Sequence, residues 1–358
     1  MGQRIYWVPH TVCYFGCKHC HNDSVMGGIR ASRQVIDGII AHLPEQESRY
    51  RLDEVLVGGG ESLMRNSEME YLIRGFRARY PRGPQATMAE RRAAGHVILA
   101  LQTIGTPLAD ASGNPNPKII NYWLDQGVDY FQIASNDMFH ERQRPDFPWE
   151  TFRANLRQYG EEHGIHFLIY GKAPHRLLPS GRALENLEEL EQAGATLLLE
   201  GGYCAQAWEA AANFLTGAEN EHPECSEVVI DPYGWVHPCC WHELSPGLFD
   251  LTRTDFAAGM TALLDVPFCH ALDRGDMMQF AEIAGVDLAT ARQIRDQVGD
   301  CGACRLFSTV LATQPDNDWI RVSALSPQEV VFYTNHVGRP LLDRWIEPAR
   351  NPIQLQTP

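Results

Sequence analysis

Hydrophobic positions in the first two hundred residues alternate between two spacings. Short, nearly continuous apolar runs are typical of buried strands, and apolar residues recurring every three or four positions indicate one face of a helix. Strands are expected over residues 5–8, 54–57, 97–102, 130–134, 166–169 and 195–199. Helices are expected over residues 33–43, 67–80, 118–126, 149–163 and 181–192. This succession of strand and helix predicts an α/β fold built from parallel βα units.

Five or six such units fit a partial or full barrel better than a small doubly wound sheet. In either arrangement, ligands bind at the carboxyl ends of the strands. Three polar or glycine-rich segments follow predicted strands: a cysteine-rich run after residue 8, Gly58 to Glu61, and Ser135 to Asp137. We therefore expect these three segments to lie on one rim of the sheet.

The alternating pattern stops near Leu199, which divides the chain into three parts. Residues 1–203 form the βα part, and residues 204–310 form a smaller α+β unit with a helical insertion near 270–300. Residues 311–358 form a helical extension whose helix begins at Ser326-Pro327-Gln328-Glu329, a capping box with proline in its first turn.

Charge and composition narrow the class of protein. The chain has 358 residues and a formal net charge of −15, which argues against nucleic acid as a partner because phosphate binding needs clustered Lys and Arg. No apolar stretch is long enough to span a membrane, and the N-terminal residues lack the apolar core of a signal peptide. We expect a cytoplasmic protein whose ten cysteines bind metal more readily than they form disulfides.

Three cysteines, Cys13, Cys17 and Cys20, form a C-x₃-C-x₂-C run after the first strand. Iron–sulfur clusters are usually held by four thiolates, so a cluster held by three leaves one iron open to a substrate or cofactor. The alternative is a structural zinc site, which takes four ligands. Its fourth ligand would come from nearby, from His10, His19 or His21.

This run resembles the signature of the radical S-adenosylmethionine (radical SAM) superfamily, which follows the first strand of a partial (β/α)₆ barrel. Cys13, Cys17 and Cys20 match it without insertion. The resemblance implies a [4Fe–4S] cluster on these cysteines that binds S-adenosyl-L-methionine (SAM). It also implies that His19, just before the last cysteine, lies near the adenine.

The second motif of the superfamily is Gly-Gly-Glu at the end of the next strand, and Gly59-Gly60-Glu61 matches it in residue and placement. The resemblance implies that these residues line the amino group of SAM. The chemistry is suitable, because glycine lets backbone carbonyls approach a ligand closely and a carboxylate pairs with an ammonium group.

A looser resemblance covers the fourth strand, where the superfamily has a polar residue at the ribose and an arginine at the carboxylate of SAM. Ser135, Asp137 and Arg142 are the candidates for these roles. A helix-capping role for Asn136 or Asp137 is the alternative. Two shorter segments also resemble the group: Thr103-Ile104-Gly105 resembles its Thr-Asn-Gly, and Gly181-Arg182-Ala183 resembles a Gly-Arg-Ala segment after the barrel.

Four later cysteines resemble the twitch module of the SPASM/twitch radical SAM enzymes. A hairpin turning at Pro232-Tyr233-Gly234 and a C-x₂-C pair would hold one auxiliary [4Fe–4S] cluster, on Cys225, Cys239, Cys301 and Cys304. A Cys₄ zinc site has equal spacing and stays open, and Cys240 is an alternative to Cys239. Because no cysteine follows Cys304, we expect one auxiliary cluster rather than two.

The resemblance implies that the protein generates a 5′-deoxyadenosyl radical, which abstracts a hydrogen atom from the substrate. The auxiliary cluster would accept an electron in a two-electron oxidation. Cys204, after the last predicted barrel strand, is a candidate hydrogen-atom donor, which would make the enzyme an epimerase or another redox-neutral enzyme. The alternative for Cys204 is a buried, small apolar side chain.

The substrate class is inferred from the start of the chain, where no leader-recognition domain precedes the first strand. This favours a polar small molecule, such as an aminocyclitol or amino sugar, as the substrate to be oxidised. A flavodoxin- or ferredoxin-type protein is expected as the electron donor. A ribosomal peptide is the second candidate substrate. A non-catalytic iron–sulfur or zinc scaffold is the alternative of another class.

Overall fold

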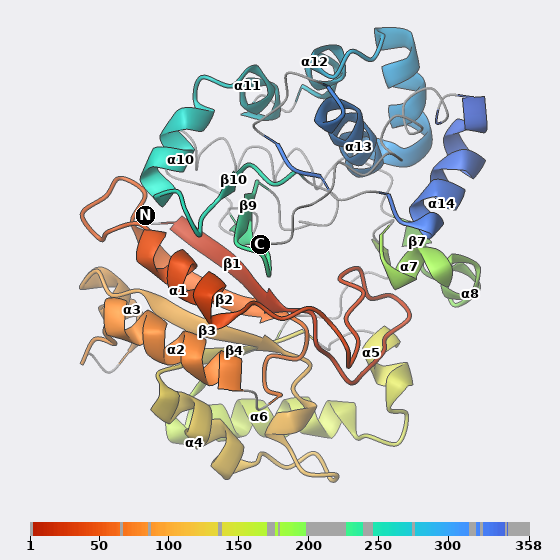
Figure 1. Ribbon diagram of the computed structural model, residues 1–358. Coiled ribbons are helices and arrows are strands. Elements are labelled where there is room, and N and C mark those ends of the chain that lie inside the picture. The colour runs from red at the N-terminus through yellow and green to blue at the C-terminus, as the bar shows by residue number, and fades with distance from the viewer. Residues whose placement is uncertain are drawn as a thin grey trace.

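An eight-stranded sheet forms the centre of the protein (Figure 1). The computed structural model describes residues 3–64, 67–84, 87–134, 138–169, 176–177, 180–197, 227–238, 246–273, 276–314, 320–322, 325–340 and 342. The strand order is β10-β9-β8-β1-β2-β3-β4-β5. Its parallel part comprises the strand β8 beside β1 and the five strands β1 (Gln3–His10), β2 (Leu52–Gly59), β3 (Ile98–Thr103), β4 (Tyr130–Ile133) and β5 (His166–Ile169).

Helices connect these parallel strands, which confirms the predicted α/β class. They are α1 (Arg33–His42), α2 (Ser67–Arg79), α3 (Met88–Ala93), the 3₁₀ turn η1 (Thr106–Leu108), α4 (Pro117–Gln126), α5 (Met138–Gln143) and α6 (Trp149–His163). Local signals set their ends: the Ser32 side chain accepts a hydrogen bond from the amide of Val35, and Gly127 ends α4 in the left-handed conformation. The short helices α3 and α5 were not predicted.

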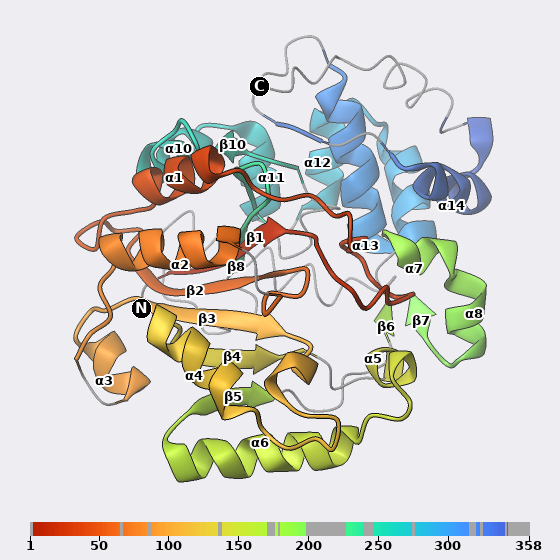
Figure 2. The same cartoon turned by 60° about the horizontal axis from the view of Figure 1, so that its bottom comes forward.

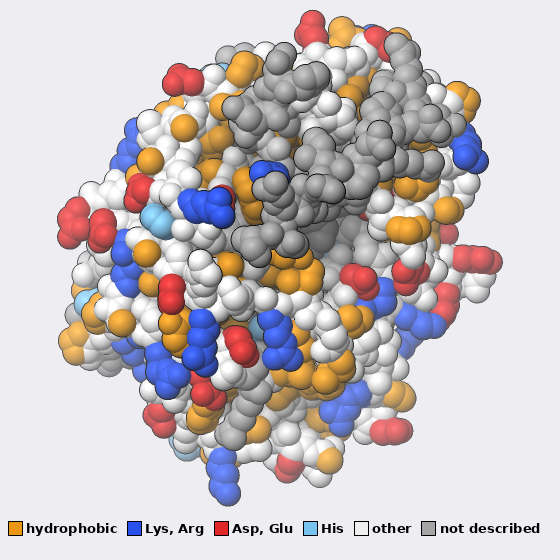
Figure 3. Space-filling model, in the orientation of Figure 1, with side chains coloured by type: hydrophobic (Ala, Val, Ile, Leu, Met, Phe, Trp, Pro, Cys, Tyr) orange, Lys and Arg blue, Asp and Glu red, His pale blue; other side chains and the backbone are white. Residues whose placement is uncertain are grey.

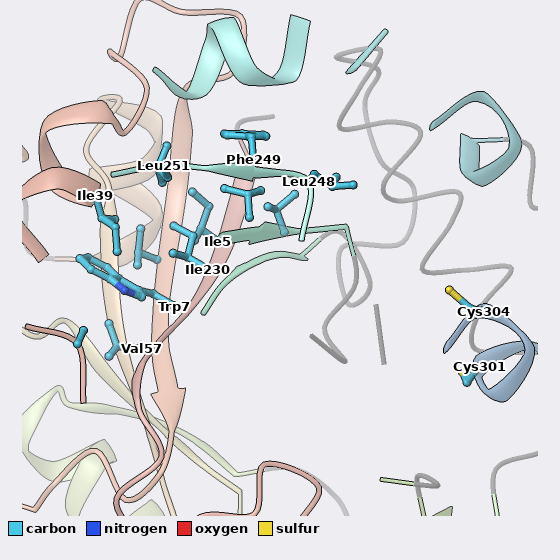
Figure 4. Packing of buried hydrophobic residues seen from close by; sticks show 14 of the residues in the cluster. Ile5, Trp7, Ile39, Val57, Ile230, Leu248, Phe249, Leu251, Cys301 and Cys304 are labelled. Carbon is cyan, nitrogen blue, oxygen red and sulfur yellow. The ribbon is translucent and has the colours of Figure 1, made fainter. Parts of the chain in front are cut away.

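The two faces of the sheet carry different side chains, because successive residues of a strand point to opposite sides. Ile5 and Trp7 of β1 lie in the core that α1, α2, α4 and α6 cover, and Figure 4 shows Trp7 beside Ile39 of α1. Tyr6 and Val8 lie on the opposite face, in a second cluster with residues of β2, β3, β4 and the strand β8 (Glu227–Ile230).

The predicted hairpin is present, with Pro232-Tyr233-Gly234 in its turn. It joins β8 to β9 (Trp235–His237), and β10 (Phe249–Asp250) pairs with β9. The Asp231 side chain accepts hydrogen bonds from the amides of Tyr233 and Trp235, and Gly234 has a φ of 92°, which glycine adopts readily. Since β8 pairs in parallel with β1, the hairpin extends the main sheet instead of forming a sheet of its own.

The predicted sixth strand is described only at β7 (Thr196–Leu197), which pairs with β6 (Arg176–Leu177) in a separate two-stranded sheet. Within the described residues, β5 and β10 are the two edges of the main sheet. The helix expected over 181–192 is two short helices, α7 (Arg182–Glu185) and α8 (Leu187–Gln192), because the backbone at Asn186 departs from helical geometry.

The helices described after the hairpin include α10 (Phe256–Leu263), α11 (Pro267–Asp273), α12 (Met277–Ile283), α13 (Leu288–Ala312) and α14 (Pro327–Val337). The helical stretch predicted over 277–298 covers α12 and the first part of α13. The capping box predicted at Ser326 is confirmed: its hydroxyl accepts from the amide of Glu329, whose carboxylate accepts from the amide of Ser326.

The described surface is mixed in charge. Figure 3 shows Lys and Arg side chains interspersed with Asp and Glu across the described part of one face. Among the helices described, none is long and apolar enough to cross a membrane. The domain limits proposed above stay a prediction.

A buried carboxylate anchors the amino-terminal end of the parallel sheet. Asp129, just before β4, accepts hydrogen bonds from Arg77, Arg82 and Arg91, and also from the backbone amide of Leu99 at 2.9 Å. Its side chain has no exposed surface. One carboxylate thus joins α2, α3, β3 and β4, at the end of the strands opposite the cysteine loop.

We expect Asp129→Asn to lower the free energy of unfolding by about 3 kcal/mol, because breaking a buried ion pair leaves uncompensated charge. Urea denaturation of the purified protein measures this change. The matched control is Asp125→Asn, at an exposed position of α4, which should change the stability little. Equal stabilities of the two variants would contradict the anchoring role.

Candidate functional site

The cysteine loop connects the end of β1 to the start of α1. Between these two elements it lies beside α5 and α7 (Figure 1 and Figure 2). Its base is closed by backbone hydrogen bonds from Thr11 to Ile29, from Val25 to Thr11 and from Cys13 to Val25, at 2.9 to 3.1 Å. Cys17 is buried, and Cys13 and Cys20 are half-buried. No disulfide joins any of the three.

The loop presents its sulfurs as hydrogen-bond acceptors. The amide of Phe15 donates to Cys13 Sγ at 3.4 Å, and the amide of Ser24 donates to Cys20 Sγ at 3.3 Å. Gly16 has a φ of 60°, and a side chain there would meet no atom within 4 Å, so the loop backbone is uncovered at this point. Three neighbouring thiols, two of them with amide donors, suit a thiolate-bound metal group.

Burial raises the pKa of the Cys13 thiol to about 11, although the amide of Phe15 opposes the rise. A metal ligand must be a thiolate, so the positive charge of a metal group is what would ionise Cys13. Within the described residues, no three His, Cys, Asp or Glu side chains are arranged to hold one metal ion. A cluster differs from such an ion, because it takes each thiolate on a separate iron.

His10 was an alternative ligand for zinc. Its side chain is 2% exposed, and its Nδ1 accepts a hydrogen bond from the amide of Val12 at 3.2 Å. Burial, followed by the charge of Arg30, lowers the pKa of His10 to about 4. The ring is therefore neutral at physiological pH. Because its Nδ1 accepts a hydrogen bond, its Nε2 carries the proton and cannot ligate a metal in this tautomer.

The glycines of Gly59-Gly60-Glu61 contact the cysteine loop itself. The carbonyl of Gly59 accepts from Asn22 Nδ2 at 3.0 Å and from Ser24 Oγ at 3.3 Å. The amide of Gly60 donates to the carbonyl of His10 at 2.9 Å. A Cβ atom at Gly60 would lie 2.1 Å from the carbonyl oxygen of Val12, so a larger residue would push the loop away. The two predicted motifs thus form one unit.

Glu61 is 1% exposed and joins the ends of β2 and β3. Its Oε1 accepts from Thr103 Oγ1 at 2.7 Å and from the amide of Leu63 at 2.9 Å, and its Oε2 accepts from the amide of Ile104 at 3.0 Å. Burial raises the pKa of Glu61, and these donors oppose the rise. Pairing of this carboxylate with the SAM amino group stays a prediction.

His19 contacts α5 through its ring. It stacks on Phe139, with ring centroids 4.7 Å apart and planes 25° apart, and it meets His140 edge-on at 4.7 Å. Sequence reasoning missed both aromatic residues, because α5 was not predicted. Arg142 lies on the same helix and is exposed. The adenine role of His19 and the carboxylate role of Arg142 stay predictions.

Gly181 and Arg182 hold the other side of the cysteine loop. Arg182 donates to the carbonyl of Cys17 at 3.0 Å, to the carbonyl of Ser24 at 2.8 Å and to Asp23 at 3.1 Å. Its amide donates to the carbonyl of Cys20 at 3.1 Å. Gly181 has a φ of 55°, and a Cβ atom there would lie 2.5 Å from the carbonyl oxygen of His21. The Gly-Arg-Ala resemblance pointed to this segment without assigning it a contact.

The second cysteine pair lies on α13. Cys301 and Cys304 are 8% and 5% exposed, and neither forms a disulfide. Figure 4 shows both away from the labelled residues of the sheet. Gly299 breaks the helix with a φ of 69°, so Cys301 begins a new helical segment. Unpaired amides in a first helical turn favour a thiolate. A buried ion pair follows directly, with Arg305 Nε 2.8 Å from Glu329 Oε1 of α14.

Several predicted site residues lie outside the described residues, and the structure says nothing of them. They are Ser135, Asn136, Asp137, Cys204, Cys225, Cys239 and Cys240. The structure therefore brings Cys13, Cys17, Cys20, His19 and the Gly-Gly-Glu motif together, and it places Cys301 and Cys304 on one helix.

The comparisons with known proteins add little to this geometry. No protein-family model matches the chain, and no curated protein matches it. One solved structure that resembles it is described as native anSMEcpe with bound AdoMet and Cp18Cys peptide. It is 11% identical, with a TM-score of 0.42, and the match covers 98% of this chain and 100% of that one. The resemblance to radical SAM enzymes therefore depends on the cysteine loop and the Gly-Gly-Glu motif.

We expect Arg182→Met to loosen the cysteine loop without unfolding the protein. Each lost hydrogen bond contributes about 1 kcal/mol, so the amides of residues 17–24 should exchange with deuterium at least about tenfold faster. Hydrogen-exchange mass spectrometry measures this rate. Arg157→Met, at an exposed position of α6, is the control. Unchanged exchange in the loop would show that Arg182 does not hold it.

We expect His10 to make the folded state sensitive to acid. The unfolded chain binds a proton at His10 below about pH 6.5 and the folded chain only near pH 4, so stability falls as the pH drops through this window. Between pH 7 and 4.5 the wild-type protein should lose roughly 2 kcal/mol more than His10→Asn. Urea denaturation at both pH values measures the loss. Parallel losses in the two proteins would refute this prediction.

Proposed function

We propose that this protein is a radical SAM enzyme. The observation that carries the proposal is the docking of the cysteine loop on the Gly-Gly-Glu motif, through Asn22 and Ser24 to the carbonyl of Gly59 and from the amide of Gly60 to His10. Asn22 and Gly59 are 37 residues apart in the chain. Two motifs of one cofactor-binding signature are therefore held together by direct hydrogen bonds.

In this proposal Cys13, Cys17 and Cys20 hold a [4Fe–4S] cluster whose open iron takes SAM. The cluster and SAM together would supply a 5′-deoxyadenosyl radical, which would abstract a hydrogen atom from the substrate. The protein orients the cofactor and excludes water. His19 is the candidate for the adenine, and backbone groups of Gly59 and Gly60 are candidates for the amino group. Ser135, Asp137 and Arg142 keep their proposed ribose and carboxylate roles.

The sheet face that carries Tyr6 and Val8 supports a polar small molecule as substrate. Directly below the motif, Tyr6 accepts from the amide of Gly59 at 2.8 Å and donates to Gln102 at 2.7 Å. Further along the same face, Arg4 donates to Gln132 at 3.1 Å. This face therefore offers amide and hydroxyl groups to a substrate with several polar substituents. An aminocyclitol or amino sugar fits this description.

We further propose that Cys225, Cys239, Cys301 and Cys304 hold one auxiliary [4Fe–4S] cluster in a twitch-type arrangement. The hairpin begins just after Cys225 and ends just before Cys239, and β8 pairs Glu227 with Arg4 near the start of β1. The Cys13 loop follows the other end of β1. The hairpin and the cysteine loop are thus attached to the same strand, β1.

An auxiliary cluster in this place would accept the second electron of a dehydrogenation. We propose a flavodoxin- or ferredoxin-type protein as the electron donor and the reducing cytosol as the compartment. None of the six described cysteines forms a disulfide, which is compatible with this compartment. Cys204 stays the candidate hydrogen-atom donor of a redox-neutral reaction.

Iron counting after anaerobic reconstitution tests the proposal. The wild-type chain should hold about eight irons and form 5′-deoxyadenosine from SAM under a strong reductant. A variant with Cys13, Cys17 and Cys20 replaced by Ala should hold about four irons and form no 5′-deoxyadenosine. Replacing Cys301 and Cys304 by Ala should also leave about four irons, but 5′-deoxyadenosine should still form.

Cys269→Ala is the control, because Cys269 is a buried cysteine outside both sets that forms no disulfide, and this variant should keep about eight irons. A wild-type chain that binds zinc and does not cleave SAM would refute the enzyme proposal. It would favour the metal-binding scaffold instead.

A further inference from the structure

Tyr333 of α14 is fully buried, and its hydroxyl has no hydrogen-bond partner among the described residues. A buried hydroxyl without a partner costs about 1 to 3 kcal/mol. Other buried tyrosines avoid this cost: Tyr80 donates to the carbonyl of Pro44, and Tyr130 donates to Glu54, each at 2.7 Å. The exception at Tyr333 therefore indicates an acceptor that the described part of the metal-free chain does not supply.

The ring of Tyr333 lies against the turn that carries the second cysteine pair. A Cβ atom added to Gly302, between Cys301 and Cys304, would be 3.5 Å from Tyr333 Cε1. Burial raises the pKa of Tyr333, followed in size by the effect of Glu329, so the hydroxyl keeps its proton and remains a donor. Cys301 and Cys304 also act on its ionisation.

The ionic groups beside Tyr333 are already engaged with each other. Glu329 accepts from Arg305 at 2.8 and 3.3 Å and from the amide of Ser326 at 2.7 Å. Arg305 has no acceptor atom in its side chain. Cys301 and Cys304 lie one and two residues from Gly302, on which the ring of Tyr333 packs, so their sulfurs are the candidate acceptors. A thiol sulfur accepts weakly, whereas a charged acceptor forms a much stronger hydrogen bond.

We propose that Tyr333 donates its hydroxyl hydrogen to a thiolate of Cys301 or Cys304 when this pair holds its metal group, and thereby raises the reduction potential of that group. The inference rests on the auxiliary cluster of the proposed function. Hydrogen bonds to cluster sulfurs set the potential, because they stabilise the more negative, reduced state. Tyr333 is thus a tuning residue that does not touch the substrate.

The test compares Tyr333→Phe with the parent protein in the full-length chain whose Cys13, Cys17 and Cys20 are replaced by Ala, so that only the auxiliary group is present. We expect Tyr333→Phe to keep about four irons and to have a lower midpoint potential in an anaerobic redox titration followed by electron paramagnetic resonance. In the metal-free chain, the same substitution should leave the stability to urea unchanged or raise it, because it removes an unpaired hydroxyl.

Tyr80→Phe is the matched control, since it removes a paired hydroxyl far along the chain from either cysteine set. It should lower the stability and leave the midpoint potential unchanged. The proposal is overturned if Tyr333→Phe leaves the potential unchanged. It is also overturned if this substitution destabilises the metal-free chain as Tyr80→Phe does, because the hydroxyl would then already have a partner.

A failure of the proposed function would be visible earlier, in the parent protein itself. If the chain without Cys13, Cys17 and Cys20 binds no iron, the auxiliary cluster is refuted, and the role of Tyr333 with it. If iron is bound and Tyr333→Phe has the parent potential, only the role of Tyr333 fails.

Discussion

The candidate site depends on the close backbone contact between the cysteine loop and the end of β2. The amides of Gly60 and Glu61 donate to the carbonyls of His10 and Val12, each at 2.9 Å, in continuation of the parallel pairing of β1 with β2. Only glycine fits at position 60, because a Cβ atom would overlap the Val12 carbonyl. The loop therefore receives its orientation from the sheet and not from its own sequence.

Buried polar contacts brace this contact from two sides. Glu61 connects β2 to β3 through Thr103 and the amide of Ile104, so the end of β3 also holds the Gly-Gly-Glu motif in place. On the other side of the loop, Arg182 donates hydrogen bonds to the carbonyls of Cys17 and Ser24. Lys18 also forms an ion pair with Glu189 of α8. A loop rich in exposed backbone groups would otherwise be costly to order, and these contacts satisfy its carbonyls.

The same contacts continue towards the second cysteine pair. Glu185 of α7 accepts a hydrogen bond from Gln328 of α14 at 2.7 Å, and the next residue, Glu329, pairs with Arg305 of α13. Arg305 directly follows Cys304 in the chain. The C-terminal helix α14 thus lies between the segment that holds the first cysteine loop and the helix that carries Cys301 and Cys304. This position gives the extension a structural purpose that its sequence did not suggest.

The sequence by itself determined the parallel βα units, the hairpin turn at Pro232 to Gly234, the capping box at Ser326 and the candidate chemistry at the cysteines, because periodicity, turn residues and ligand spacing are local properties. Only the tertiary structure decided that the hairpin joins β1, that Gly60 is needed by the loop, and that Arg182 and Tyr333 lie beside the two cysteine sets. These pairs are far apart in the chain, and a lone arginine or tyrosine carries no local pattern that names its partner. Long-range packing, which single-residue propensities do not encode, selects those contacts.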